Sequence, residues 1–266
     1  MIPLGGTDFP ATAADLANAL RAALRPVVRL PDERAAVTVD PGQLRIDLSG
    51  GIVAVPGQFE DSVGVGQPQP GPTFQSLEVL AHPLIVEGVN VQFNLAATAV
   101  RFNFDRTRAG RPVMTLAAAT AGRIVGRVSR TDLQALVTAK ARAAAKEKGI
   151  DIEQIDIDLT QLGPRSVKVD VKATVQTKAL FKSIRGAVTF AGRLDVDDRL
   201  VAKLSELNVA GEGMMIALAV NMIRGRVTAL EGKEYPLTAF ALGGVALRDV
   251  QMQVGDELMV TAAFGS

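Results

Sequence analysis

Apolar and polar residues alternate along most of this chain, with the period of two that is typical of β-strands. The clearest example is SVKVDVKATVQTK, in which Val167, Val169, Val171 and Val175 alternate with charged and polar residues. Such a segment places apolar side chains on one face of a sheet and polar side chains on the other. The same alternation predicts further strands in QLRIDLSG, VNVQFNLAATAVRFNFD, IDIEQIDIDLTQLG, GAVTFAGRLDVDD, LVAKLSELNVAG, VALRDVQMQV and ELMVTAAF.

Three segments instead have the spacing of helices. Residues 11–25 predict a short amphipathic helix, because Thr12 and Asp15 have the spacing of a capping box. A second helix is predicted over about 130–148, with an apolar stripe along one side. A third is predicted over about 213–231, and its first half is apolar on nearly all sides, so we expect it to be covered.

The order of these elements predicts an α+β fold. The strands follow one another without crossover helices between them, which favours a mostly antiparallel sheet. The chain of 266 residues is near the upper limit for one hydrophobic core, and we expect a single domain over 1–266. The proline- and glycine-rich stretch 64–73 (GVGQPQPGPT) predicts a loop.

Composition narrows the function classes. Apolar residues make up 48% of the chain but aromatic residues only 4%, so any core or cavity must be mainly aliphatic. The net charge of +1 provides no overall field for nucleic acid, and the absence of cysteine excludes disulfides and thiolate chemistry. No membrane-spanning run and no signal peptide are visible, so we expect a cytoplasmic protein, or a cell-envelope protein if a leader has been removed.

Catalytic and metal-binding signatures are missing from the sequence. The only histidine, His82, lies between apolar residues and next to a proline, with no motif around it. We therefore interpret it as a structural residue at a strand end rather than as a general base. The carboxylates in DIEQIDID (151–158) and DVDD (195–198) lack EF-hand spacing, and their alternation suits the outer face of a strand better than a calcium site. The predictions are no enzyme, no cofactor and no metal.

Two segments carry features that point to a binding function. Met214, Met215 and Met222 cluster on the predicted third helix, and methionine suits surfaces that accept varied apolar partners. A helix that only fills the core of a sheet explains these residues equally well. The segment KALFKSIRG (178–186) interleaves basic and apolar residues between two strands, as a membrane-contacting tip would. An ordinary connection is the favoured explanation there. The membrane-contact candidates are Lys178, Leu180, Phe181, Lys182, Ile184 and Arg185.

Several blocks in order give the chain a resemblance to a known family. TFQSLEVLAHPLIVEGVNVQF, GRVSRTDLQALV, SVKVDVKATV, GRLDVDDRLVAKLSELNVAG and the closing PLTAFALGGVALRDVQMQVGDELMVTAAFG resemble the bacterial DUF2993 family. Its members include LmeA-type phospholipid-binding proteins, which are similar in fold to the tubular lipid-binding (TULIP) superfamily. The resemblance implies a strongly curved, mostly antiparallel sheet wrapped around long helices, with an apolar groove for acyl chains and no catalytic residues.

The leading functional hypothesis is therefore a lipid carrier or sensor that binds acyl chains of a phospholipid or fatty acid. A transient contact with a membrane surface and a homodimer fit the same hypothesis, and nucleic acid is not an expected partner. The alternative is a structural or assembly module with a packed core that binds a protein partner. The residues predicted to line the groove are Leu133, Leu136, Val137, Met214, Met215, Leu218, Met222 and Ile223.

Overall fold

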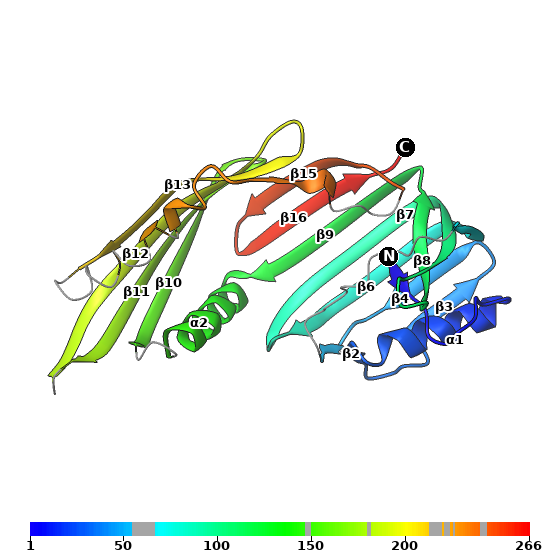
Figure 1. The fold of residues 1–266 in the computed structure, drawn as a ribbon, viewed down its shortest axis with the longest axis horizontal. Coiled ribbons are helices and arrows are strands. Elements are labelled where there is room, and N and C mark those ends of the chain that lie inside the picture. The colour runs from blue at the N-terminus through cyan, green and yellow to red at the C-terminus, as the bar shows by residue number, and fades with distance from the viewer. Residues whose placement is uncertain are drawn as a thin grey trace. The chain divides into compact units, whose positions relative to one another are not determined.

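The fold is mostly β (Figure 1), with strands accounting for 59% of the chain and helices for 16%. In the described residues the helices are short: α1 (Ala13–Leu24) has 12 residues and α2 (Arg130–Lys146) has 17. The predicted α+β fold, with a sheet wrapped around long helices, is therefore wrong. A helix enclosed by a sheet would be buried on most sides. Helix α1 instead buries side chains on one side only, and no residue of α2 is buried. The computed structural model describes residues 1–54, 67–146, 150–179, 182–212, 220, 224–225, 227–239 and 244–266.

The chain forms two compact units, and each is described by itself. The first comprises Met1–Val128, Thr238–Val250 and Val260–Ser266, and the second comprises Ser129–Leu237 and Gln251–Met259. Strands β15 (Leu247–Val254) and β16 (Glu257–Phe264) contribute residues to both units. The prediction of a single domain stays a prediction.

The first unit is built on two strands of 18 residues each, β6 (Gln69–Val86) and β7 (Val89–Arg106). They pair antiparallel and are joined at Glu87 and Gly88, whose φ angles of 52° and 82° suit the tight turn of a hairpin. Along the sheet the order is β15-β16-β9-β7-β6-β4-β3, with β4 and β6 parallel. The other strands are β1 (Ile2–Pro3), β2 (Val28–Arg29), β3 (Val37–Asp40), β4 (Gln43–Asp47), β5 (Ile52–Val53), β8 (Pro112–Ala118) and β9 (Ala121–Ser129).

The beginning of β6 was predicted to be a loop. Residues 69–73 instead belong to the strand, and residues 64–66 lie outside the described residues. Gly71 lies so close to β7 that a Cβ atom there would be 2.9 Å from the carbonyl oxygen of Phe102. The glycine therefore allows a close approach of two backbones, and the register of the pair shifts between Pro70 and Thr73.

One face of this sheet carries the main hydrophobic core. Helix α1 begins with the predicted capping box, in which the Thr12 hydroxyl accepts from the Asp15 amide at 3.1 Å. Its buried side chains, Leu16 and Leu20 among them, pack against the sheet. The largest side chains that are less than 2% exposed are Phe102, Leu20, Leu44, Met114, Val37, Val100, Val113 and Pro112.

The second unit is a five-stranded antiparallel sheet in the order β10-β11-β12-β13-β14. Its apolar face carries a smaller core of Ile152, Ile155, Val175, Val209 and Val220. Ala141 and Ala145 of α2 pack against this core. The strands are β10 (Ile150–Gly163), β11 (Ser166–Ala179), β12 (Lys182–Val196), β13 (Val201–Gly211) and β14 (Glu234–Pro236), followed by the 3-10 turn η1 (Leu237–Ala239).

Helix α2 contacts the edge strand β10 largely through polar side chains. Arg142 donates to the carbonyl oxygens of Ile152 and Glu153 at 3.0 and 2.9 Å. Gln134 donates to the carbonyl of Ile155 at 2.8 Å. Arg130 reaches the carbonyl of Leu159 at 3.2 Å. Gln134 lies four residues after Arg130, and Arg142 lies eight residues after Gln134, so the three share one side of the helix.

The predicted third helix is described only in part. Val220, Arg224, Gly225, Val227 and Thr228 are helical, and the rest of its first half lies outside the described residues. Among the helices in the ranges given above, none is both long and apolar enough to cross a membrane.

Candidate functional site

A strip of apolar residues on β6, β7 and β9 continues the core face of the first unit beyond the packed core. Cross-strand pairing sets three successive rows on this face, each with one residue per strand. The three strands lie side by side in Figure 1. We call this set the apolar strip: Val79, Leu95 and Ile124; then Ala81, Phe93 and Gly126; then Leu84, Val91 and Val128.

Most of the apolar strip is only half-buried. Val79, Leu95 and Ile124 still pack against the core, and Ala81 is fully buried. The side chains of Phe93, Leu84, Val91 and Val128 are half-buried. The strip carries no polar side chain, so it offers an apolar surface without hydrogen-bonding groups of its own.

Two glycines on this face of β9 have different surroundings: Gly122 lies one row before the strip, and Gly126 lies in its middle row. A Cβ atom on Gly122 would lie 2.1 Å from the ring of Phe264, which is 3% exposed and belongs to the core. No described atom lies within 4 Å of a Cβ atom built on Gly126, four residues further along the same face. The face is therefore filled at Gly122, whereas no atom of the described residues covers it at Gly126.

The opposite face of the same strands mixes charged, polar and apolar residues. Glu78 lies beside Ala96 and Arg123 in one row, and Arg45 on β4 forms an ion pair with Glu78 at 3.3 Å. Charged side chains therefore occur on this face, whereas the apolar strip has none. The strip was not predicted from the sequence, although apolar residues alternate with other residues in VNVQFNL and GRIVGRV.

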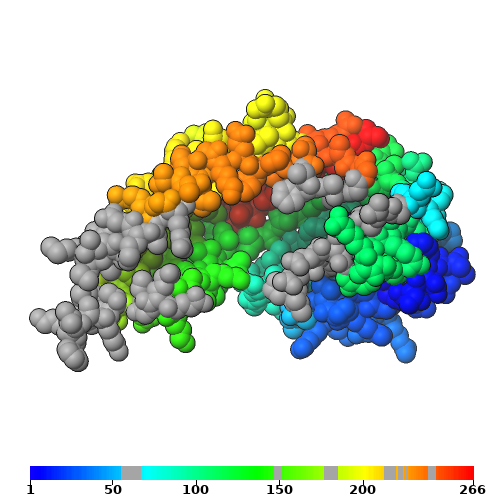
Figure 2. Space-filling model, viewed as in Figure 1, coloured from blue at the N-terminus to red at the C-terminus, as the bar shows by residue number. Residues whose placement is uncertain are grey.

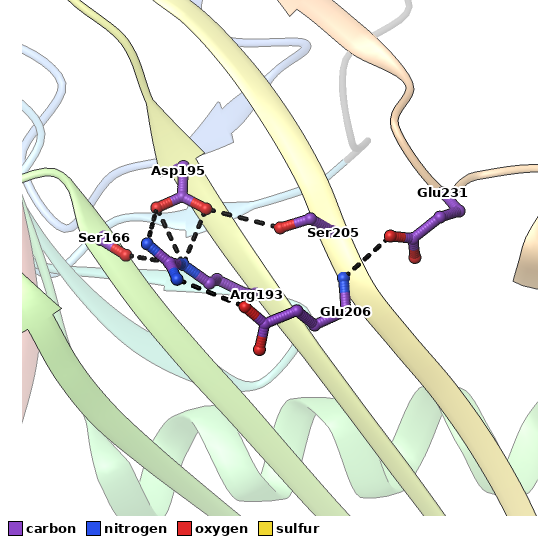
Figure 3. Close-up of polar contacts among 6 residues, drawn as sticks. All are labelled: Ser166, Arg193, Asp195, Ser205, Glu206 and Glu231. Carbon is purple, nitrogen blue, oxygen red and sulfur yellow. Dashed lines mark hydrogen bonds and ion pairs between the residues drawn. The ribbon is translucent and has the colours of Figure 1, made fainter.

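A polar network lies on the outer face of the second unit (Figure 3). Arg193 donates to Asp195 at 2.8 Å, to Ser166 at 3.2 Å and to Glu206 at 3.3 Å. The Glu231 carboxylate accepts from the amide of Glu206 at 2.9 Å and from the next amide along β13 at 2.7 Å. The register of β12 and β13 shifts at this point, and Glu206 has a φ of 54°. The network therefore satisfies the backbone groups of a β-bulge.

The charges of this network suit a structural role. Burial raises the pKa of the Asp195 carboxyl, but hydrogen bonds from Ser166 and Arg193 outweigh it, so its pKa lies below the ordinary 3.8. The hydrogen bond to Asp195 in turn raises the pKa of Arg193. Both groups stay ionised at neutral pH, so neither is poised for proton transfer there.

Asp156 and Asp158 of the acidic segment 151–158 line a hollow of about 400 Å³ in the second unit. Its carboxylates have partners: Asp156 accepts from Gln154 at 2.9 Å, and Asp158 pairs with Arg130 at 3.5 Å. No group of three or more histidine, cysteine or carboxylate side chains that could hold a metal ion occurs in the described part of the chain. The segment is a solvated strand face.

The predicted lipid groove stays a prediction, because the structure describes only three of its eight lining residues. Leu133, Leu136 and Val137 are half-buried on α2. The same helix packs against the core of the second unit through Ala141 and Ala145, and its polar side chains contact β10. The other predicted lining residues lie outside the described residues: Met214, Met215, Leu218, Met222 and Ile223.

The predicted membrane-contacting tip is formed by the hairpin of β11 and β12. Leu180 and Phe181 lie outside the described residues, and Lys178, Lys182 and Ile184 are described only in backbone register. Arg185 is exposed and forms an ion pair with Glu153 of β10. A contact with a membrane stays a prediction.

His82 is exposed near the end of β6, and its amide donates to the Ser49 hydroxyl at 2.9 Å.

No family model matches the sequence, and neither a curated protein nor a solved structure is significantly similar to it. The resemblance to the DUF2993 family therefore stays a prediction, while the fold that it implied is wrong.

Proposed function

We propose that this protein binds the acyl chains of a phospholipid or fatty acid on the apolar strip, as a carrier or sensor that catalyses no reaction. The observation that carries the proposal is a half-buried, wholly apolar strip on which no atom of the described residues lies within 4 Å of a Cβ atom built on Gly126. Half-buried aliphatic side chains that gain a hydrocarbon partner lose contact with water, which favours binding.

The strength of binding would come from the hydrocarbon. Each methylene buried contributes about 0.8 kcal/mol. The strip has no donor or acceptor side chain that could read a headgroup, so we expect weak discrimination between lipid classes.

Native mass spectrometry of the purified protein, with lipid extraction from the same sample, tests the proposal first. We expect a bound phospholipid or fatty acid at near-stoichiometric occupancy. Protein that stays at its bare mass after incubation with mixed liposomes would contradict the proposed function, and would favour a packed module that binds a protein partner.

A matched pair of variants then tests the location. Gly126→Trp places a bulky side chain on the strip where the described residues leave room for one, so we expect the bound lipid to be lost. Ala96→Trp places the same side chain at an exposed position on the opposite face of the sheet and serves as the control. Wild-type occupancy in a folded Gly126→Trp variant would show that lipid binds elsewhere.

A further inference from the structure

The apolar strip is closed at one end by the ring of Phe264. The row before the strip consists of Leu77, Ala97 and Gly122, one residue on each of the same three strands. A Cβ atom on Gly122 would lie 2.1 Å from the tip of the Phe264 ring, so the ring occupies the space above this glycine. Leu77 and Ala97 are each 4% exposed. The apolar face thus continues beyond the strip, but at this row it is covered.

Hydrogen bonds hold the segment of chain that carries Phe264. Strand β16 lies beside β9 (Figure 1), and in Figure 2 its red atoms adjoin green atoms of the same unit. Directly after the ring, the amide of Gly265 donates to the carbonyl of Ala246 at 3.2 Å. The amide of Ser266 donates to the carbonyl of Ala119 at 3.0 Å. Phe264 is only 3% exposed, so its ring is a fixed part of the core, and a ligand on the strip meets it as a wall.

The surroundings of Gly126 differ from those of Gly122. The two glycines lie on the same face of β9, two rows apart. No atom of the described residues lies within 4 Å of a Cβ atom built on Gly126, and Phe93 in the same row is half-buried. A hydrocarbon chain that lies over Gly126 and runs along the strands toward Gly122 therefore meets the ring of Phe264.

We infer that Phe264 sets the longest acyl chain that the apolar strip binds in full, which makes it the residue that determines chain-length specificity. This inference rests on the function proposed above for the strip. Each methylene that leaves water for the strip strengthens binding about fourfold. Methylenes beyond the ring find the face already covered, so they add no affinity. The ligand is therefore selected by the length of its chain rather than by its headgroup, since the strip has no polar side chain.

The spacing of the rows gives the size of the expected effect. A strand advances about 3.3 Å per residue, so one row of this face is about 6.6 Å long. An extended alkyl chain has the zigzag of an extended backbone, which advances about 3.3 Å for every three bonds. One row thus corresponds to about six chain carbons, and the three rows of the strip to about eighteen.

Displacement of a bound fluorescent fatty acid by saturated fatty acids, from octanoate to behenate, tests the inference. With the wild-type protein we expect the affinity to rise about fourfold per added methylene and then to level off at a break. The break should come at or below about eighteen carbons. An affinity that still rises at behenate, or that does not depend on chain length, would overturn the inference.

Two substitutions of Phe264 move the wall. Phe264→Ala opens the row above Gly122 and should shift the break toward longer chains by up to about six carbons. Phe264→Leu keeps an apolar side chain in the core and should shift the break in the same direction by less, which gives a result even if the alanine variant does not fold. Phe102→Leu is the matched control, because Phe102 is 1% exposed in the same core but belongs to no row of the strip. Its break should stay at the wild-type length.

The outcomes separate a failure of this inference from a failure of the proposed function. A wild-type protein that binds none of the fatty acids would overturn both. Binding that is lost in Gly126→Trp, together with an unmoved break in folded Phe264→Leu, would overturn only the role of Phe264. An equal shift in Phe102→Leu would overturn that role as well, because a loosened core would then explain the change. A shift confined to the Phe264 variants supports the inference.

Discussion

Helix α1 buries Leu16, Ala17 and Leu20 against the sheet of the first unit, whereas α2 of the second unit buries none of its residues. The first unit also contains Phe102 and Phe74, whose rings meet edge to face at 6.2 Å. In the second unit the helix contributes two alanines and several hydrogen bonds to a strand edge. One unit thus relies mainly on apolar burial, and the other depends more on polar contacts to the backbone.

The largest effect should come from truncating matched leucines on the two helices. Leu20→Ala removes a side chain that is 1% exposed, so we expect a loss of about 3–5 kcal/mol in the free energy of unfolding. Leu136→Ala removes a half-buried leucine from α2 and should cost about 1 kcal/mol or less. Denaturant unfolding of both variants measures the difference, and equal losses would remove the contrast between the two units.

The polar contacts of α2 should have an intermediate effect. Arg142→Met keeps the aliphatic stem of the side chain but removes both hydrogen bonds to β10. At about 1 kcal/mol for each bond, we expect a loss of about 1–2 kcal/mol. Hydrogen exchange should become faster in α2 and unchanged in α1. An unchanged unfolding midpoint would mean that the alanines alone hold α2 in place.

The capping box of α1 should contribute slightly less. Thr12→Ala removes the hydroxyl that accepts from the Asp15 amide, at a cost of about 1 kcal/mol. Thr12→Ser keeps this hydroxyl and is the control. If both variants melt at the same temperature below the wild type, the cap does not contribute through its hydrogen bond.

The smallest effect should appear in acid. The pKa of Asp195 is lower in the folded protein than its ordinary value of 3.8, so its contribution is complete above pH 3.8 and is lost as the pH falls through the lower folded value. Asp195→Asn should therefore lower stability at neutral pH and leave a smaller gap to the wild type in strong acid. A gap that stays constant with pH would contradict this linkage.

Local signals in the sequence predicted individual elements well. The Thr12 and Asp15 pair marked the beginning of α1, and the alternation from Val167 to Val175 marked β11. The second helix was expected over about 130–148 and is observed as Arg130–Lys146. These elements follow from spacing alone, because a cap or an alternating strand needs only near neighbours.

Features that depend on distant partners were not predictable. The stretch from Gln69 to Thr73 reads as a loop by composition, but it pairs with β7 because Gly71 admits a close backbone approach. Gln134 and Arg142 donate to carbonyls of β10 that lie 21 and 10 residues away in the sequence. The apolar strip depends on the register of three strands, which no single segment of sequence contains.

The position of α2 along β10 has a further consequence for how the protein behaves in concentrated solution. An exposed sheet edge invites another chain to add a strand, which is a common route to aggregation. Here the carbonyls of Ile152, Glu153, Ile155 and Leu159 are already engaged by helix side chains. At the other side of the same sheet, Glu231 occupies two amides of β13 beside the three-residue strand β14. We therefore expect this sheet, although rich in isoleucine and valine, to resist growing edge to edge with its own copies.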